Sequence, residues 1–285
     1  RMEQNVSQEL LCQGLCSKSK LSKIENGSLQ PDIMLSEALL QRLGISDRVF
    51  TFWGNQKETR FHDLKLKVIH THHIPEKTIS TWLNEMEQLL GKNDILYRQE
   101  YSFLRTLNQN IPGKRITGLM EALQLTLKNF NINQICSYRL TWCELSILNN
   151  LAMEYCLTSQ IDLCFTYTSQ IIAYIKKVQP NILLQNNILP YTYLVHCRTL
   201  YHQNLFRQIL EFTRNVNMSL IKYNISAYSG YLFFYSQALG ECSSHDEAHS
   251  NAINAYALSE IREYYKNSVA LKKYFNEDFS IILNY

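Results

Sequence analysis

The sequence is poor in the two residues that most often interrupt regular structure. It has 9 glycines and 5 prolines among 285 residues. Glycine and proline build tight turns and end helices, so their scarcity argues against a fold with many turns. No segment shows a sustained two-residue alternation of apolar and polar side chains, which is the pattern of a half-buried strand. The sequence therefore predicts an all-α fold.

Membrane and export signals are also missing. No run of 18 apolar residues is present, and the chain shows no signal peptide. The eight cysteines form no CxxC pair, and they lie within apolar helical patterns, as expected for reduced, buried thiols. These features predict a cytoplasmic protein with no membrane partner.

The sequence shows no set of residues that would carry catalysis or hold a metal. There is no glycine-rich phosphate loop and no nucleophile elbow. His62, His70, His72 and His73 lie close together, but the last three do not share the i, i+4 helical spacing and no carboxylate or cysteine completes a ligand set. We expect a protein that is not an enzyme, with no catalytic residues, no metal and no cofactor.

The most informative stretch that is present runs from Ser17 to Gly27. Ser17 is a good N-cap residue, and Gly27 suits the left-handed position just beyond a helix end. Leu21 and Ile24 are three residues apart and share one face of the predicted helix. The rest of its surface carries lysines and serines, the side chains that reach base edges and phosphates in a DNA groove.

A second short helix is predicted just before this one. Ser7 is its expected cap, Leu10 and Leu11 supply its apolar side, and Gly14 to Cys16 form the turn that follows. Two short helices joined in this way make a helix-turn-helix. The alternative to a DNA-binding motif is a pair of surface helices with solvated lysines.

The residues of this segment resemble the Xre/Cro repressor family. The resemblance is carried by Ser7-Gln8-Glu9, the turn from Gly14 to Ser17, the run Leu-Ser-Lys-Ile-Glu-Asn-Gly at 21–27, and Pro31. It continues through an expected helix from Ile33 to Leu43, capped by Asp32, and a further helix that begins near Ser46. Only about five residues precede the first motif helix, so we expect residues 1–50 to form a partial DNA-binding head that lacks its usual first helix.

The charge of this head is balanced. Its first 48 residues carry six basic and six acidic side chains, namely Arg1, Lys18, Lys20, Lys23, Arg42 and Arg48 against Glu3, Glu9, Glu25, Asp32, Glu37 and Asp47. The net charge of the whole chain is +3. Any affinity for double-stranded DNA must therefore come from the local placement of lysines and not from a global field.

The helix-turn-helix geometry divides the polar residues of the head into two groups. Lys18, Ser19 and Lys23 are expected to face base edges. The residues expected to hold phosphates are Ser7, Gln8, Lys20 and Asn26.

The remainder of the chain is helical in pattern. Charges of alternating sign in residues 51–75 predict a solvated linker helix. Within 76–285, three pairs of helices are expected, each pair joined by a short connector: 145–155 with 161–178, 191–201 with 206–218, and 228–239 with 246–261. Such pairs are typical of an α-solenoid of helical hairpins, and Ala152 with Tyr155 resembles a degenerate tetratricopeptide repeat. A plain helical bundle remains the alternative.

A partial Xre-type head followed by such repeats resembles the peptide-pheromone regulators of the Rgg, Rap, PlcR and PrgX group. The resemblance implies a homodimeric transcription regulator whose repeat domain binds a short signalling peptide. Asparagine can both donate to and accept from a peptide backbone, and Asn149 and Asn150 lie in mid-helix, where asparagine is a poor helix former. The candidate peptide-binding residues are Asn149, Asn150, Tyr193, His196, Tyr231 and Tyr235.

A second function from a different class stays open. The chain would then be a protein-interaction scaffold with a vestigial DNA-binding head, which the missing first helix favours. The sequence does not define the operator, the peptide or the sign of regulation.

Overall fold

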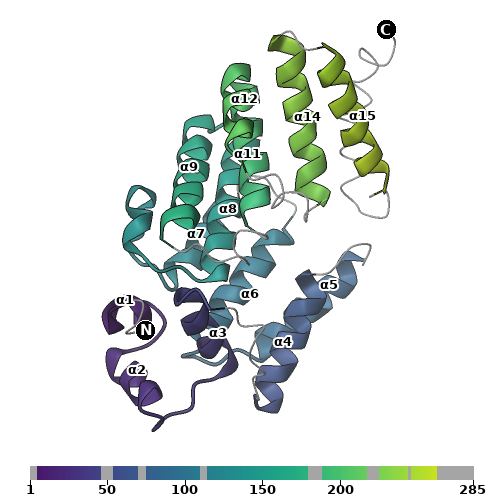
Figure 1. Cartoon of the computed structure of the whole chain (residues 1–285). Helices are drawn as coiled ribbons and strands as arrows, with labels where there is room; N and C mark the ends of the chain where they lie inside the picture. Colours follow the sequence, from purple (N-terminus) through teal and green to yellow (C-terminus); the bar gives the residue numbers. More distant parts are fainter. Residues whose placement is uncertain are drawn as a thin grey trace.

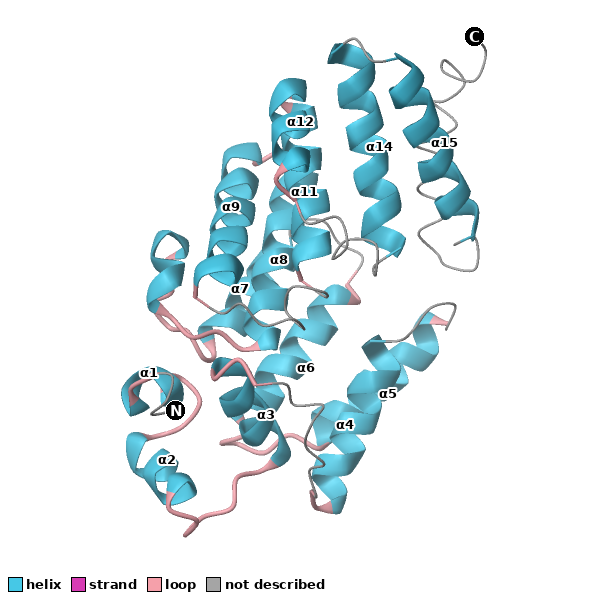
Figure 2. Cartoon of the chain, viewed as in Figure 1, coloured by secondary structure: helices cyan, strands magenta, loops and turns pink. Residues whose placement is uncertain are grey.

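A computed structural model of the chain describes residues 5–45, 54–69, 75–109, 114–178, 188–216, 225–242 and 245–261. Every regular element within these ranges is a helix, and none of them contains a strand (Figure 2). The predicted all-α class is therefore confirmed. The helices are α1 Gln8–Cys12, α2 Lys18–Glu25, α3 Ile33–Arg42, α4 Gln56–Ile69, α5 Glu76–Gln88, α6 Ile95–Leu107, α7 Lys114–Gln124, the 3-10 helix η2 Ile132–Ser137, α8 Trp142–Leu157, α9 Ile161–Lys177, α11 Leu189–His202, α12 Phe206–Arg214, α14 Ile225–Cys242 and α15 His245–Ile261.

The three helices α1 to α3, which we call the head, begin and end where the local signals place them. The side chains of Ser7, Ser17 and Asp32 each accept a hydrogen bond from the backbone N–H three residues later, at 3.1, 3.1 and 2.9 Å. Each bond satisfies one of the N–H groups that the first turn of a helix leaves free. Gly27 follows α2 with φ of +75°, the left-handed conformation expected of a residue after a helix end.

The head has a small apolar core of its own. Its buried side chains come from all three helices and from the turns between them: Val6, Leu11, Cys12, Leu15, Leu21, Leu35, Ala38 and Leu39. Leu10 and Ile24, which the sequence places on the apolar side, pack against this core but stay partly exposed. Each of the three helices therefore turns an apolar face toward a shared core.

The predicted helix that begins near Ser46 lies outside the described residues. The next described element is α4, where the sequence predicts a solvated linker helix. One side of α4 buries Phe61, Leu64 and Val68, which follow each other at spacings of three and four residues. Lys57, Asp63 and Lys67 are exposed, whereas Lys65 lies 3.3 Å from the buried Glu100 carboxylate, so the helix is only partly solvated.

The last three helix pairs form stacked hairpins, and each pair matches a predicted one to within a few residues. Helix α8 pairs with α9, α11 with α12, and α14 with α15; α11 also packs on α9, and α14 packs on α11 and α12. Figure 1 shows the three hairpins in chain order, with α14 and α15 at the end away from the head. We call the elements from α5 to α15 the array. One continuous apolar core runs through it because each hairpin buries its inner face on the next.

The array contains one element that the sequence pattern did not predict. Residues between α7 and α8 form the 3-10 helix η2. Its N-cap is Asn131, whose side chain accepts a hydrogen bond from the Asn133 N–H. No described helix is both long and apolar enough to cross a lipid bilayer.

Candidate DNA-binding and peptide-binding surfaces

Helix α2 presents the three side chains that the sequence assigns to base edges. Lys18, Ser19 and Lys23 are all exposed. On the opposite side, Leu21 is 2% exposed and anchors the helix in the core of the head. Amines and a hydroxyl on an exposed helical face, backed by one buried leucine, have the chemistry needed to contact the edges of bases and the oxygens of phosphates.

The residues assigned to phosphate contacts surround this face, and most of them also make local bonds. The Gln8 amide donates to the Glu25 carboxylate at 2.6 Å and links α1 to α2. The Asn26 Oδ1 accepts hydrogen bonds from the backbone N–H of Ser28 at 3.1 Å and from its hydroxyl at 2.6 Å, which closes the turn after α2. Ser7 caps α1, and Lys20 is partly exposed. Gln8 and Asn26 are therefore held in place before any ligand arrives.

The head is joined to the array by a buried ion pair that the sequence did not reveal. Arg42, at the end of α3, and Glu144, in the first turn of α8, lie 102 positions apart, and neither side chain is exposed. One terminal nitrogen of Arg42, Nη2, lies 3.0 and 3.3 Å from the two carboxylate oxygens of Glu144. The other, Nη1, donates to the backbone oxygens of Leu11 at 3.1 Å and Gln13 at 2.6 Å, where α1 ends.

Further hydrogen bonds hold Glu144 in this position. Its Oε2 accepts from the Thr141 N–H at 2.7 Å, and the Thr141 hydroxyl accepts from the Glu144 N–H, so the two residues form a capping box at the start of α8. Its Oε1 accepts from the Thr126 hydroxyl at 2.6 Å, and Gln99 donates to that hydroxyl at 2.7 Å. A second bond crosses the joint: the Trp142 N–H donates to the Gln41 side chain at 2.9 Å.

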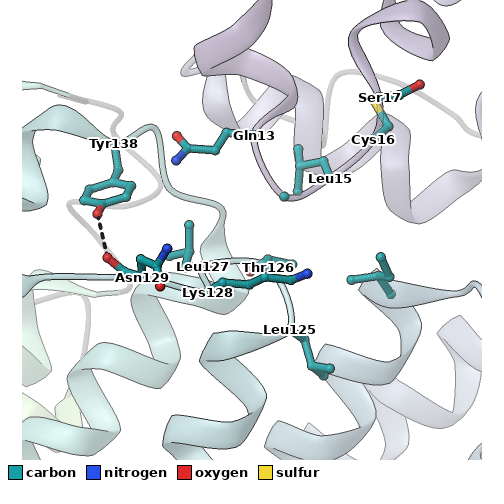
Figure 3. A pocket seen from close by; sticks show the side chains of 12 residues that line it. Gln13, Leu15, Cys16, Ser17, Leu125, Thr126, Leu127, Lys128, Asn129 and Tyr138 are labelled. Carbon is teal, nitrogen blue, oxygen red and sulfur yellow. Dashed lines mark hydrogen bonds between the residues drawn. The ribbon is translucent and has the colours of Figure 1, made fainter.

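A cavity of about 510 Å³ lies beside this joint (Figure 3). One wall is the turn between α1 and α2, which contributes Leu15 and Cys16, and the other is the segment after α7, where the Tyr138 hydroxyl donates to the Asn129 carbonyl at 3.3 Å. Gly14 lies at the closest approach of the two walls, with φ of +72°. A Cβ atom on Gly14 would overlap the backbone oxygen of Thr126, so this position requires glycine.

The two candidate asparagines of the peptide site lie in the middle of α8, and both are partly exposed. The Asn149 Oδ1 accepts a hydrogen bond from the Thr192 hydroxyl of α11 at 3.1 Å. The Asn150 amide donates to the Ser146 carbonyl of its own helix at 2.8 Å. Each amide is oriented by one bond and keeps polar atoms for another partner.

The four remaining candidates lie on α11 and α14, and three of them are buried. Tyr193 and Tyr231 are each 1% exposed, and His196 is 7% exposed. Tyr235 is partly exposed and donates to Glu247 at 3.1 Å. The structure brings Asn149 and α11 together through Thr192, whereas the tyrosines of α14 lie one hairpin further along the array.

His196 is held in an aromatic environment. Its ring lies 5.0 Å from the ring of Phe165 and 4.7 Å from that of Phe212, measured between centroids, and its Nδ1 is 2.8 Å from the Thr168 hydroxyl. Burial lowers the pKa of His196 to about 4, because the charged imidazolium loses its hydration. His196 is therefore neutral at physiological pH.

A smaller hollow of about 200 Å³ lies between α5 and α6, and sequence reasoning did not point to it. Its polar lining includes Asn84, Glu87, Arg105 and Asn108, and the Arg105 guanidinium lies 6.0 Å from the ring of Tyr101. No local sequence signal marks it because its residues come from two helices whose polar faces resemble ordinary solvated surface.

Within the described ranges, no group of three or more histidine, cysteine or acidic residues could hold a metal ion. His62 lies on α4, while His70, His72 and His73 lie outside the described residues. The expected burial of the cysteines is found for Cys12, Cys156, Cys164 and Cys197, whereas Cys136, in the 3-10 helix η2, is exposed.

The geometry defines a class of protein: a small three-helix head, docked through a buried ion pair on a stack of helical hairpins. A solved structure with a similar fold is the crystal structure of Bacillus thuringiensis PlcR in complex with the peptide PapR7 and DNA. The two chains superpose with a TM-score of 0.57 over 95% of each, at 17% sequence identity. No protein-family model and no curated protein matches the sequence. The comparison shows that the chain has the fold of PlcR.

Proposed function

We propose that the chain is a DNA-binding transcription regulator whose array binds a short signalling peptide. One observation carries the proposal: an anchored helix with exposed Lys18, Ser19 and Lys23 stands on a helical-hairpin array, in a fold that PlcR shares over 95% of both chains. PlcR was solved with a peptide and with DNA. At 17% identity that likeness extends to the fold, so the function rests on the surfaces of this chain.

In this proposal the head is an Xre/Cro-type helix-turn-helix, and α2 enters the major groove. Lys18, Ser19 and Lys23 contact base edges, while Ser7, Gln8, Lys20 and Asn26 contact phosphates. Phosphate contacts fix the position of a reader on the duplex, and base contacts give it sequence preference. Two heads on a homodimer would contact two half-sites of an operator about one helical turn, or a multiple of it, apart.

The proposed peptide site is centred on the middle of α8. Asn149, Asn150 and Tyr235 are partly exposed, so their polar atoms are the ones available to an extended peptide backbone. Tyr193, His196 and Tyr231 are buried and would support the wall behind them. Regulation of transcription by an imported peptide places this activity in the cytoplasm, and no step of it needs an enzyme or a cofactor.

The decisive experiment is a thermal-unfolding titration of the full chain with synthetic peptides of five to ten residues encoded beside its gene. A peptide that binds the folded chain alone raises Tm by mass action, by about 2.7 kcal/mol of added stability at 100 times its Kd. The control is the same peptide with its residue order scrambled.

The same chain is then titrated into labelled double-stranded DNA from upstream of that gene. A rise in Tm together with sequence-preferring DNA binding is the expected result. A rise in Tm without any DNA binding would favour the scaffold with a vestigial head. If no peptide raises Tm, the sensing role is wrong.

A further inference from the structure

We infer that Arg42 and Glu144 are positioning residues that fix the head on α8, so that head and array move as one body and present α2 to DNA in a set orientation. We call this ion pair with its bonds to the α1 carbonyls the latch. The DNA readout of this inference rests on the proposed function, whereas the docking of the head does not.

The guanidinium of Arg42 bridges two parts of the chain with two different atoms. Its Nη1 donates to the main-chain oxygens of Leu11 and Gln13, which belong to the end of α1 and the turn before α2. Its Nη2 faces the carboxylate of Glu144, which belongs to the array. The rigid plane of the guanidinium therefore ties the path of the α1–α2 turn to the start of α8.

Burial and hydrogen bonds hold the two side chains of the latch in one arrangement. Arg42 and Glu144 are both fully buried, so no water competes for their charges. The two oxygens of Glu144 are also engaged by Thr126 and by the Thr141 N–H, so the carboxylate is held in place. A buried charge that lost its partner would be strongly unfavourable, which keeps the head docked.

Two further contacts join the head to the array. Gly14 brings the backbone of the α1–α2 turn against the backbone oxygen of Thr126, and Gln41 accepts from the Trp142 N–H at 2.9 Å. Both contacts join the head to the same region of the array as the latch. Three separate pairs of residues therefore restrain the head on the array.

The docked state leaves the proposed DNA-contacting face open. Lys18, Ser19 and Lys23 are exposed while the latch is closed, so the latch orients α2 and does not mask it. Glu144 lies on the same helix as Asn149 and Asn150, about 8 Å away at 1.5 Å per residue. Helix α8 is thus the element of the array that holds the head.

The test is hydrogen exchange of the full-length chain, read at the amides of Leu15 and Cys16. Both amides donate to the Cys12 carbonyl, at 2.9 and 3.1 Å, and both lie in the turn that the latch holds. We expect Glu144→Gln to speed their exchange by roughly tenfold or more while amides of α11 change by less than about twofold. The apparent Kd for a labelled duplex of about 30 bp should rise by at least roughly fivefold, although every DNA-facing side chain is retained.

The matched control is Glu154→Gln. Glu154 is also on α8, is also buried, and pairs with Arg115 at 3.2 Å, but it lies within the array. We expect this variant to leave both the exchange of the turn and the DNA affinity unchanged. If the two variants change the turn equally, or if Glu144→Gln leaves the turn amides as protected as in the parent chain, the latch is refuted.

If Glu144→Gln does not fold, Thr126→Val decides the matter. This change nearly keeps the side-chain volume and removes the hydroxyl that donates to Glu144 and accepts from Gln99, whose amide keeps its bond to the Ala122 carbonyl. A smaller increase in exchange of the same amides is expected. Unchanged exchange in that variant would overturn the inference. A parent chain that binds no duplex would refute the proposed DNA function, while the exchange data would still decide whether the head is latched.

Discussion

Thr192 of α11 donates a hydrogen bond to the Oδ1 of Asn149 on α8, at 3.1 Å, and so ties together two helices from adjacent hairpins. The bond fixes the orientation of the Asn149 amide, because its oxygen must face the Thr192 hydroxyl. The Nδ2 donors are then left for a peptide carbonyl, which is the group that an extended peptide offers at every residue. A candidate contact residue is thus oriented by a neighbour that is itself fully buried.

The first prediction concerns the two asparagines of α8. Asn149→Ala and Asn150→Ala should each weaken the stabilising effect of the signalling peptide by about five- to tenfold in apparent Kd, because a net hydrogen bond contributes about 1 kcal/mol. The control is Asn215→Ala at the end of α12, which loses a bond to the carbonyl four residues earlier, as Asn150 does. Thermal-shift titration measures all three, and equal effects in Asn150→Ala and Asn215→Ala would remove Asn150 from the site.

The second prediction concerns the exposed lysines of α2. Lys18→Ala and Lys23→Ala should each weaken specific operator binding by about 1–3 kcal/mol without changing the unfolding midpoint, since both side chains are exposed. The control is Lys92→Ala, which removes the same single positive charge at an exposed position between α5 and α6. Gel-shift titration against specific and scrambled duplexes provides the measurement. Unchanged affinity in both head variants would show that α2 is not the reading helix.

The third prediction follows from the buried imidazole of His196. Its pKa is about 4 in the folded chain, against 6.5 for an ordinary histidine, so the unfolded chain binds more protons between these two values. Stability is therefore fully present above pH 6.5 and is lost as the pH falls toward 4. Between pH 7 and pH 5 this one group should cost about 2 kcal/mol of unfolding free energy.

The measurement is urea unfolding at pH 7 and pH 5, compared with His196→Gln. Glutamine keeps a polar group opposite Thr168 but does not titrate, so the variant should lose about 2 kcal/mol less than the parent chain over this pH interval. Identical pH dependence of the two proteins would show that His196 is not neutral and buried in the folded state.

The fourth prediction compares two glycines that share a left-handed backbone. Gly14 has φ of +72° and Gly27 has φ of +75°, so replacing either by alanine carries a similar backbone cost of about 1–2 kcal/mol. At Gly27 a Cβ would meet no atom within 4 Å, whereas at Gly14 it would overlap the Thr126 carbonyl. Gly14→Ala should therefore be less stable than Gly27→Ala by roughly 1–3 kcal/mol.

Differential scanning of the two variants provides the comparison. The decrease in Tm should be clearly larger for Gly14→Ala, and its turn amides should exchange faster. Equal Tm values would show that Gly14 is not in close contact with the backbone oxygen of Thr126.

Local signals were enough to place most helices. The N-cap bonds of the head are local, because each joins a side chain to the backbone N–H three residues later: those of Ser7, Ser17 and Asp32. Such caps can be inferred from the sequence without knowledge of the fold. The three hairpins could be inferred as well, because apolar spacing within a helix and short connectors are also local. The observed helix bounds differ from the predicted ones by a few residues, because helix ends depend on the packing of the next hairpin.

The joint between head and array could not be inferred in this way. Arg42 occupies the last turn of α3, where a basic side chain is common and usually solvated. Its partner Glu144 is the N3 residue of a capping box, which is a sufficient local reason for a glutamate at this position. Nothing in either neighbourhood indicates that the two meet across 102 positions.

The sequence also did not indicate that half of the candidate peptide-binding residues are buried, for a related reason. Tyr193, His196 and Tyr231 are amphipathic or polar side chains, and the sequence does not show which side of a helix the next hairpin covers. Their aromatic surface is packed between helices. Asn149, Asn150 and Tyr235 keep part of their surface open, and these residues should be mutated first.

Arg42 binds the end of α1 through two main-chain oxygens, those of Leu11 and Gln13. Carbonyl groups are the same in every amino acid, so these bonds survive replacement of the residues that carry them. The exposed side chains of α2 can therefore be exchanged without loss of the bonds that attach the head to α8. The attachment of the head and the chemistry of its exposed face are carried by different atoms, so each can be engineered without changing the other.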